Sequence, residues 1–131
     1  MSVHLNHTIV SARDSRESAE FLAEILGLGP PTPFGPFLGV ETANGVTLDF
    51  IDDDGDIVSQ HYAFLISDAE FDQIFARIVE RQLPYWADPA RKRSGEINSG
   101  EGLGAGGRGV YFEDPSGHFL EIITEPYAIG G

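Results

Sequence analysis

The stretch His61-Tyr62-Ala63-Phe64-Leu65-Ile66-Ser67-Asp68-Ala69-Glu70 decides the fold, because the chain carries a second copy of its pattern. The first six residues are mostly apolar or aromatic and predict a short β-strand. Ser67 and Glu70 have capping-box spacing, which satisfies the free N–H groups at a helix N-terminus. The apolar residues that follow recur at helical spacing and predict an amphipathic helix. They are Phe71, Ile74, Phe75, Ile78 and Val79.

The second copy lies near the N-terminus. It begins His7-Thr8-Ile9-Val10-Ser11-Ala12, again a strand pattern, and in both copies an Asp stands seven residues after the histidine. Asp14 and Glu17 predict the start of a helix, and Gly27 or Gly29 its end. The apolar residues between them have the same helical spacing: Phe21, Leu22, Ile25 and Leu26.

The repeat has a second half. Gly45–Ile51 and Gly117–Ile123 each begin with a glycine and continue as a strand pattern, with an acid four residues on, Asp49 or Glu121. A long Gly-rich segment, Pro89–Gly109, lengthens the second copy. The sequence therefore predicts an α+β fold: one domain, residues 1–131, made of two βαβββ half-units of about 1–56 and 57–131. We expect a curved mixed sheet with helices outside and a pocket inside.

Two copies related by pseudo-twofold symmetry bring equivalent residues together, which pairs His7 with His61 and Asp49 with Glu121. Glu121 stands among large apolar residues, where an unpaired carboxylate is expensive to bury, so it needs a cation or a cluster of hydrogen bonds. Either histidine taken alone is more commonly a hydrogen-bonded core or edge residue. Their matched placement with the acids instead predicts one divalent-metal site with His7, His61 and Glu121 as ligands. Asp49 is then either a fourth ligand or a nearby acid that does not bind the metal.

Two imidazoles and a carboxylate suit Fe(II), which we expect first, and also Mn(II), Ni(II) or Zn(II). Such a ligand set leaves positions open for substrate and for water or O₂. The chain has no cysteine, so disulfides and thiolate metal sites are excluded. Its net charge of −13 argues against nucleic-acid or anionic-membrane partners. No apolar run is long enough to span a bilayer and no export signal is present, so we expect a cytoplasmic protein.

Other features are interpreted more simply. His118 is out of phase with Glu121 on its strand, which predicts a surface or supporting role. The acidic run Asp52–Asp56 is interpreted as a solvated turn, because its glycine is misplaced for a calcium loop. The Gly-rich segment holds four of the eight cationic residues. We expect it to be either a lid over the pocket or a surface loop.

The stretch Val110-Tyr111-Phe112-Glu113-Asp114-Pro115-Ser116-Gly117-His118-Phe119-Leu120-Glu121 is similar to a family ending, Y-x-x-D-P-x-G-x-x-x-E. Together with the two histidine strands, it resembles the vicinal oxygen chelate superfamily, which holds glyoxalases, extradiol dioxygenases, fosfomycin-resistance transferases and bleomycin-binding proteins. The resemblance covers nearly the whole chain and implies the same ligands, His7, His61 and Glu121. It also implies a homodimer, in some members with modules exchanged between subunits. Tyr111 matches a tyrosine that positions substrate in the dioxygenases. The alternative interpretation is that Tyr111 is an aromatic residue of the core.

We therefore expect a metal-dependent, dioxygenase-like oxidoreductase. Its substrate would be a small vicinal diol, enediol or hydroxy-ketone, aromatic in one version, with Tyr111 as the catalytic residue. One alternative is a glyoxalase-like lyase or isomerase, in which Glu121 or Asp49 acts as a base. The other is a non-catalytic protein that binds an antibiotic or similar small molecule. Two departures from the dioxygenase pattern are that Ser99 replaces a histidine and that no histidine lies between His7 and His61.

Overall fold

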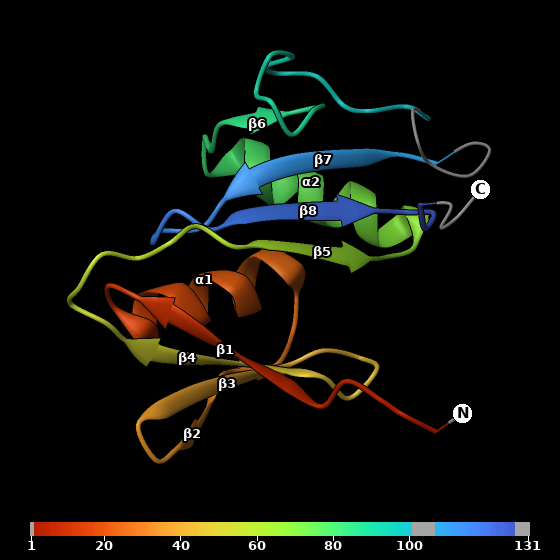
Figure 1. The fold of residues 1–131 in the computed structure, drawn as a ribbon. Helices are drawn as coiled ribbons and strands as arrows, with labels where there is room; N and C mark the ends of the chain where they lie inside the picture. Colours follow the sequence, from red (N-terminus) through yellow and green to blue (C-terminus); the bar gives the residue numbers. More distant parts are fainter. Residues whose placement is uncertain (1, 101–106, 128–131) are drawn as a thin grey trace. The chain divides into compact units, whose positions relative to one another are not determined.

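A computed structural model of the chain describes residues 2–100 and 107–127. It divides into two compact units (Figure 1). The N-terminal unit holds residues 1–58 together with 114–117, and the C-terminal unit holds residues 59–113 and 118–131. Among the described residues, no helix has the length and apolar character that crossing a membrane requires.

The N-terminal unit is one strand, a helix and three further strands, and the strand order in its sheet is β1-β4-β3-β2. β1 runs parallel to β4, and the other neighbours are antiparallel. The elements are β1 (His7–Ala12), α1 (Ser15–Leu26), β2 (Thr32–Phe34), β3 (Phe37–Glu41) and β4 (Thr47–Asp52). The buried apolar residues of β1, β3 and β4 include Val10, Val40, Leu48 and Phe50.

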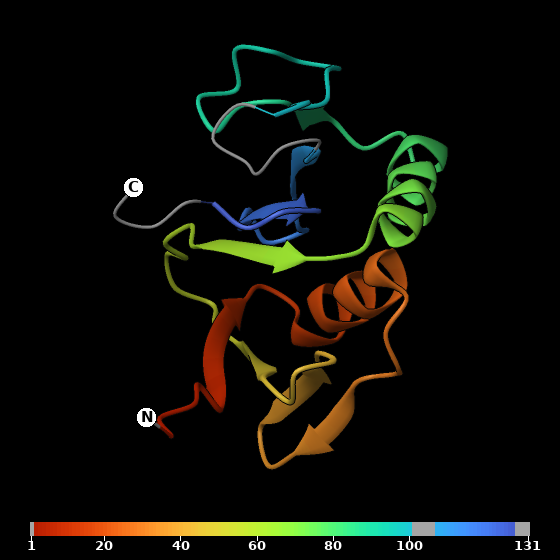
Figure 2. The same cartoon turned by 90° about the vertical axis from the view of Figure 1, so that its right-hand side faces the viewer.

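The C-terminal unit repeats this topology, with strand order β5-β8-β7-β6. Its elements are β5 (His61–Leu65), α2 (Asp68–Glu80), β6 (Tyr85–Trp86), β7 (Gly109–Glu113) and β8 (Phe119–Ile123). β5 runs parallel to β8, as β1 does to β4. Figure 2 shows each helix lying against one face of the sheet of its own unit. The predicted α+β fold with two βαβββ modules is confirmed.

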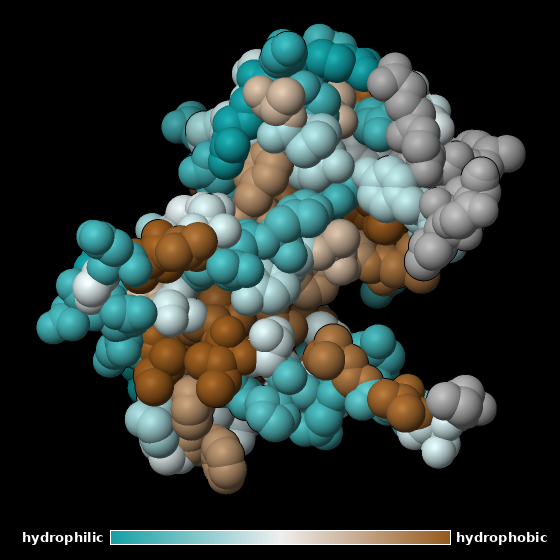
Figure 3. Space-filling view, in the orientation of Figure 1, coloured by the Kyte–Doolittle hydropathy of each residue, from teal (hydrophilic) through white to brown (hydrophobic). Residues whose placement is uncertain are grey.

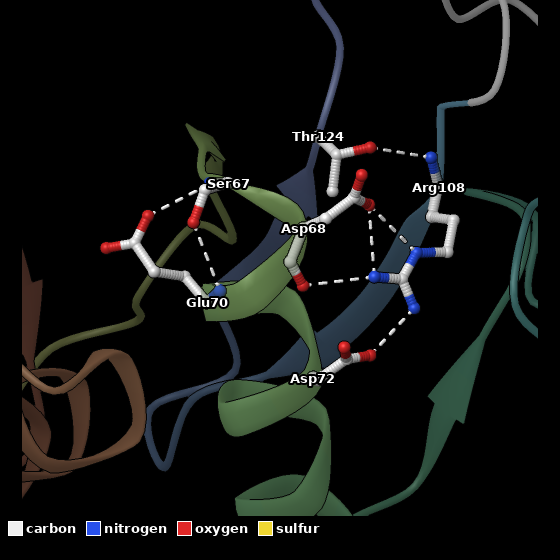
Figure 4. Close-up of polar contacts among 6 residues, drawn as sticks. All are labelled: Ser67, Asp68, Glu70, Asp72, Arg108 and Thr124. Carbon is white, nitrogen blue, oxygen red and sulfur yellow. Dashed lines mark hydrogen bonds and ion pairs between the residues drawn. The ribbon is translucent and has the colours of Figure 1, made fainter.

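Both helices begin where the sequence predicts, and α1 also ends where it predicts. The Asp14 carboxylate accepts the backbone N–H groups of Arg16 and Glu17, and α1 ends at Gly27, whose φ of 71° is left-handed. Glycine adopts that conformation without steric cost. In α2, Ser67 and Glu70 form the complete capping box (Figure 4).

The predicted apolar stripes are mostly buried. Phe71, Ile74 and Ile78 of α2 are at most 2% exposed, but Val79 is 49% exposed, so its assignment to the buried stripe was wrong. In α1 the corresponding residue, Ile25, is fully buried. Only the apolar residues that face the sheet are buried in such a helix. Val79 lies at the edge of the apolar stripe, where its side chain is exposed.

Arg108, just before β7, ties the sheet of the C-terminal unit to the start of α2 (Figure 4). Its guanidinium group donates to the Asp72 carboxylate at 2.9 Å and to Asp68 at 3.1 Å, and lies 4.3 Å from the centre of the Phe71 ring. Its backbone N–H donates to the Thr124 hydroxyl. Hydrogen bonding to Asp72 is the main cause that raises the pKa of Arg108.

The Asp-Pro-Ser-Gly turn, residues 114–117, belongs to the N-terminal unit. Gly117 has a φ of 91° and its N–H donates to the Asp114 carbonyl, a turn that a residue with a side chain would strain. The Ser116 hydroxyl accepts the backbone N–H of Arg13 and lies 3.0 Å from the Ser18 hydroxyl on α1. The turn is therefore fixed at the N-terminal end of that helix.

The described parts of the Gly-rich segment Pro89–Gly109 are hydrogen-bonded to the neighbouring sheet. Ser94 forms a β-bridge with Trp86, and Asn98 forms one with Gly109. The Asp88 carboxylate accepts the N–H groups of Lys92 and Arg93, which closes a turn. Residues 101–106, the centre of the expected lid, lie outside the described residues.

Candidate metal centre

The two units place a histidine and an acid in the same way. In the N-terminal unit His7 is opposite Thr47, two residues before Asp49 on the parallel strand. In the C-terminal unit His61 is opposite Phe119, two residues before Glu121. Residues two apart on a strand share a face, so each unit sets one imidazole and one carboxylate diagonally on one side of its sheet.

In the C-terminal unit this pair is in direct contact. His61 Nε2 lies 3.1 Å from Glu121 Oε1. The Glu121 residue is only 1% exposed, whereas the His61 side chain is 48% exposed. The pair therefore joins a half-exposed imidazole, which solvent can reach, to a carboxylate that is buried.

The partner of the other ring nitrogen, Nδ1, determines which nitrogen of His61 carries the proton. His61 Nδ1 lies 3.0 Å from the Phe119 carbonyl oxygen, which can only accept, so Nδ1 carries a proton. In the neutral ring Nε2 is then also an acceptor, and it faces a carboxylate oxygen. Two acceptors at this distance need a proton or a metal ion between them.

This arrangement fits a divalent metal. Histidine ligands usually donate the second ring N–H to a carbonyl or carboxylate, as His61 does here. Nitrogen and oxygen ligands about 2.1 Å from one ion, at right angles, lie about 3 Å apart. Within residues 2–100 and 107–127, no three or more His, Cys, Asp or Glu side chains form a ready metal-binding group. The His61–Glu121 pair is the part of the predicted ligand set that is brought together.

His7 and Asp49 stand at the equivalent positions of the N-terminal unit. His7 Nδ1 lies 2.7 Å from the Asn6 side-chain oxygen, so its Nε2 is likewise left as the acceptor. Asp49 is half-buried and stands opposite Gly39, where an added Cβ would lie 3.1 Å from Asp49 Oδ1. In the C-terminal unit Tyr111 occupies the position of Gly39, opposite Glu121.

Tyr111 is buried, and its hydroxyl lies 3.2 Å from that of Tyr127. The Tyr127 hydroxyl in turn donates to Glu121 Oε2. Loss of solvent raises the pKa of both tyrosines, and the bond to Glu121 raises the pKa of Tyr127 as well. Both hydroxyls are therefore protonated donors at neutral pH. Tyr127 was not predicted from the sequence, because it lies beyond the last repeated strand and has no counterpart in the first copy.

Aromatic rings extend from His61 along the same face of the sheet. Tyr111 stacks on Phe119 with centroids 5.1 Å apart, and His61 stacks on Tyr111 at 5.8 Å. Trp86 lies 6.0 Å from Phe119. The Arg91 guanidinium lies 4.0 Å from the centre of the Phe119 ring. We call Trp86, Tyr111 and Phe119 the aromatic wall.

His118 does not face this site. Its ring is buried, 1% exposed, and Nδ1 accepts the backbone N–H of Gln60 at 3.0 Å, just before β5. Of the two predicted roles, the surface position was wrong, whereas the supporting role stays a prediction; the predicted opposite face is correct. The strand pattern gives the face of a residue but not whether a helix covers that face.

Known proteins resemble the chain along most of its length. A family described as the glyoxalase/bleomycin resistance protein/dioxygenase superfamily matches residues 4–122. Two solved structures named oxidase ChaP-H1 and oxidase ChaP-H2 are each 58% identical, with TM-scores of 0.91 and 0.92. They cover 99% and 100% of this chain and match over their whole length.

More distant relatives share the fold. A metallothiol transferase FosB from Lysinibacillus sphaericus is 28% identical over 92% of this chain and 81% of its own length. The fosfomycin resistance protein FosX from Mesorhizobium loti has a TM-score of 0.68 at 19% identity, covering 96% of this chain and 95% of its own. With the matched family covering nearly every element of both units, the chain belongs to the glyoxalase/bleomycin resistance protein/dioxygenase superfamily.

Proposed function

We propose that the protein is a metal-dependent oxidase or dioxygenase-like enzyme acting on a small vicinal diol, enediol or hydroxy-ketone. The observation that carries the proposal is the contact of His61 Nε2 with Glu121 Oε1 at 3.1 Å, a pair that needs a proton or a metal ion between its atoms because Nδ1 already donates to the Phe119 carbonyl. The 58% identity to two proteins named oxidases supports the class of reaction.

The proposed ligands are His7, His61 and Glu121, with Fe(II) as the preferred ion. Bound there, the ion would supply Lewis acidity toward a chelating oxygen pair and a site for O₂. The chain's own residues hold the ligand atoms still: the Phe119 carbonyl fixes the His61 ring, and the Tyr127 hydroxyl fixes Glu121.

We assign Tyr111 as the catalytic residue. Its protonated hydroxyl, 3.2 Å from that of Tyr127, would turn from Tyr127 to donate its one proton to a substrate oxygen as negative charge develops there. The aromatic wall supports a planar, aromatic substrate, because stacked rings bind flat π-systems by offset stacking. Burial of Tyr111 and Phe119 keeps water from that side of the substrate.

The isomerase alternative rests on Asp49. This half-buried carboxylate stands at the repeat position of Glu121 and would serve as a base if the metal chemistry were proton transfer. The FosB similarity, at 28% identity, raises a transferase as a third class. Against it, residues 122–131 hold no match for the basic residues that, in the fosfomycin transferases which the chain resembles, hold a phosphonate.

The test loads the purified protein anaerobically with Fe(II) and measures O₂ uptake with catechols and with an aliphatic hydroxy-ketone. We expect diol-dependent O₂ uptake by the wild type and by His4→Ala, an exposed histidine outside the proposed site. His61→Ala should lose it. Metal binding without O₂ uptake on any diol would instead favour the isomerase.

We also propose a homodimer. β1 is an edge strand, and the segment leading to it exposes apolar side chains, seen as brown surface near the N-terminus in Figure 3. Val3, Leu5 and Ile9 are 86%, 69% and 56% exposed. Light scattering should give twice the chain mass, and replacing Leu5 and Ile9 by Ser should give the monomer mass. A wild-type monomer at micromolar concentration would refute the dimer.

A further inference from the structure

The two oxygens of Glu121 have different partners. Oε1 faces His61 Nε2, whereas Oε2 accepts the Tyr127 hydroxyl, which is itself in contact with the Tyr111 hydroxyl. Tyr127 can donate to Glu121 and accept from Tyr111 at once, so the three groups form one consistent chain of hydrogen bonds. The carboxylate at its end is 1% exposed, so water does not compete for Oε2.

A carboxylate binds a metal through one oxygen or through both. An O–H donor to a carboxylate is among the stronger hydrogen bonds in proteins, and it occupies electron density that Oε2 would otherwise give to the ion. We propose that Tyr127 is a positioning residue that makes Glu121 a ligand through Oε1 alone. This inference rests on the proposed function, and its consequence is one more coordination position for the substrate's oxygen pair.

The first copy of the repeat lacks this arrangement. Gly39 stands where Tyr111 stands, opposite the acid, and Gly55 follows Asp49 by the same six residues that separate Tyr127 from Glu121. Neither tyrosine hydroxyl therefore has a counterpart in the first copy. The two acids are equivalent in register, but among the described residues only the Glu121 carboxylate of the two has a tyrosine donor, which supports Glu121 rather than Asp49 as the ligand.

The test compares Tyr127→Phe with Tyr85→Phe. Tyr85 is a half-buried tyrosine of β6 whose ring packs against Phe75, outside the hydrogen-bond chain. Co(II) is titrated into each protein, and both the dissociation constant and the visible absorption spectrum are recorded, since the spectrum reports the coordination number. Far-UV circular dichroism and thermal unfolding of the metal-free proteins show that each variant is folded.

In Tyr127→Phe we expect a changed Co(II) spectrum and an affinity about tenfold weaker, the usual cost of removing a partner of a ligand. Tyr85→Phe should match the wild type in both. Tyr111→Phe keeps Tyr127 in place and should shift the spectrum in the same direction by less, so it serves as the test if Tyr127→Phe does not fold.

The possible failures are separable. A wild-type protein that binds no Co(II) would overturn the proposed function itself. Wild-type binding together with an unchanged spectrum and affinity in Tyr127→Phe would overturn only the role given to Tyr127. An effect of equal size in Tyr85→Phe would do the same, because it would show that any lost tyrosine hydroxyl perturbs the site.

Discussion

His61 Nε2 and Glu121 Oε1 face each other at 3.1 Å across the parallel strands β5 and β8, while His61 Nδ1 donates to the Phe119 carbonyl. One strand, β8, thus provides the acid and, two residues earlier, the carbonyl that sets the tautomer of its partner. The strand register puts the two residues on one face, and the bond to the Phe119 carbonyl sets the orientation of the His61 ring. The same register recurs for His7 and Asp49, so the repeat places a histidine and an acid on one face of the sheet in each unit.

Replacing Phe119 by Leu tests the aromatic wall. Leu keeps most of the buried volume and the backbone carbonyl but removes the ring that stacks on Tyr111. Stacked aromatic pairs contribute about 0.5–1.5 kcal/mol, so KM for an active catechol should rise about two- to tenfold, with kcat changed less. Steady-state kinetics on the Fe(II)-loaded protein measure this.

The control is Phe34→Leu, an exposed phenylalanine on β2 that is 72% exposed. It should leave KM unchanged. An equal KM for Phe119→Leu and the wild type would mean that substrate does not touch the wall.

The Asp52 carboxylate makes the stability of the folded protein depend on pH. The backbone N–H of Ser15 donates to its carboxylate at 2.8 Å, and this bond lowers the pKa of Asp52 below its ordinary value of 3.8. The folded state therefore binds the proton less readily than the unfolded chain does. The contribution is fully present above pH 3.8 and is lost as pH falls through the lower folded pKa.

Asp52→Asn should accordingly be less stable than the wild type at pH 7, and the difference should shrink below about pH 4. Urea unfolding at several pH values measures it. Asp56→Asn, an exposed acid of the same run, is the control and should track the wild type throughout. A difference independent of pH would show that the Asp52 charge plays no part.

The sequence predicts those features of the fold and the site that follow a local or repeated pattern. The strand at His61, the capping box at Ser67 and the helix end at Gly27 all follow from local patterns, and the structure has each of them. The repeat predicts that His61 and Glu121 belong to one site, whereas their direct contact depends on the parallel register of β5 and β8, which was not predicted. Tyr127 and the burial of His118 could not be predicted, because neither repeats and each depends on which distant segment packs nearby.

Arg108 should stabilise the C-terminal unit modestly. Its carboxylate partners, Asp68 and Asp72, are both more than 70% exposed, so each ion pair contributes at most about 1 kcal/mol, and the contact with Phe71 adds a similar amount. Arg108→Ala should lower the free energy of unfolding by about 1–2 kcal/mol. Chemical denaturation at low and high salt measures it.

Arg77→Ala, on α2, is a matched loss of a guanidinium group. If the Arg108 effect does not decrease at 1 M salt, the ion pairs contribute nothing and packing on Phe71 carries the effect alone.

The central claim is that His61 and Glu121 hold one divalent ion. Calorimetric titration of Mn(II) into the metal-free protein tests it most directly, with His61→Ala and Glu121→Gln beside His4→Ala and Glu125→Gln, two exposed residues of the same types. The account predicts a single ion per chain for the wild type and both controls, and an affinity lower by at least about 100-fold in the two site variants. Equal binding by His61→Ala and the wild type would contradict it.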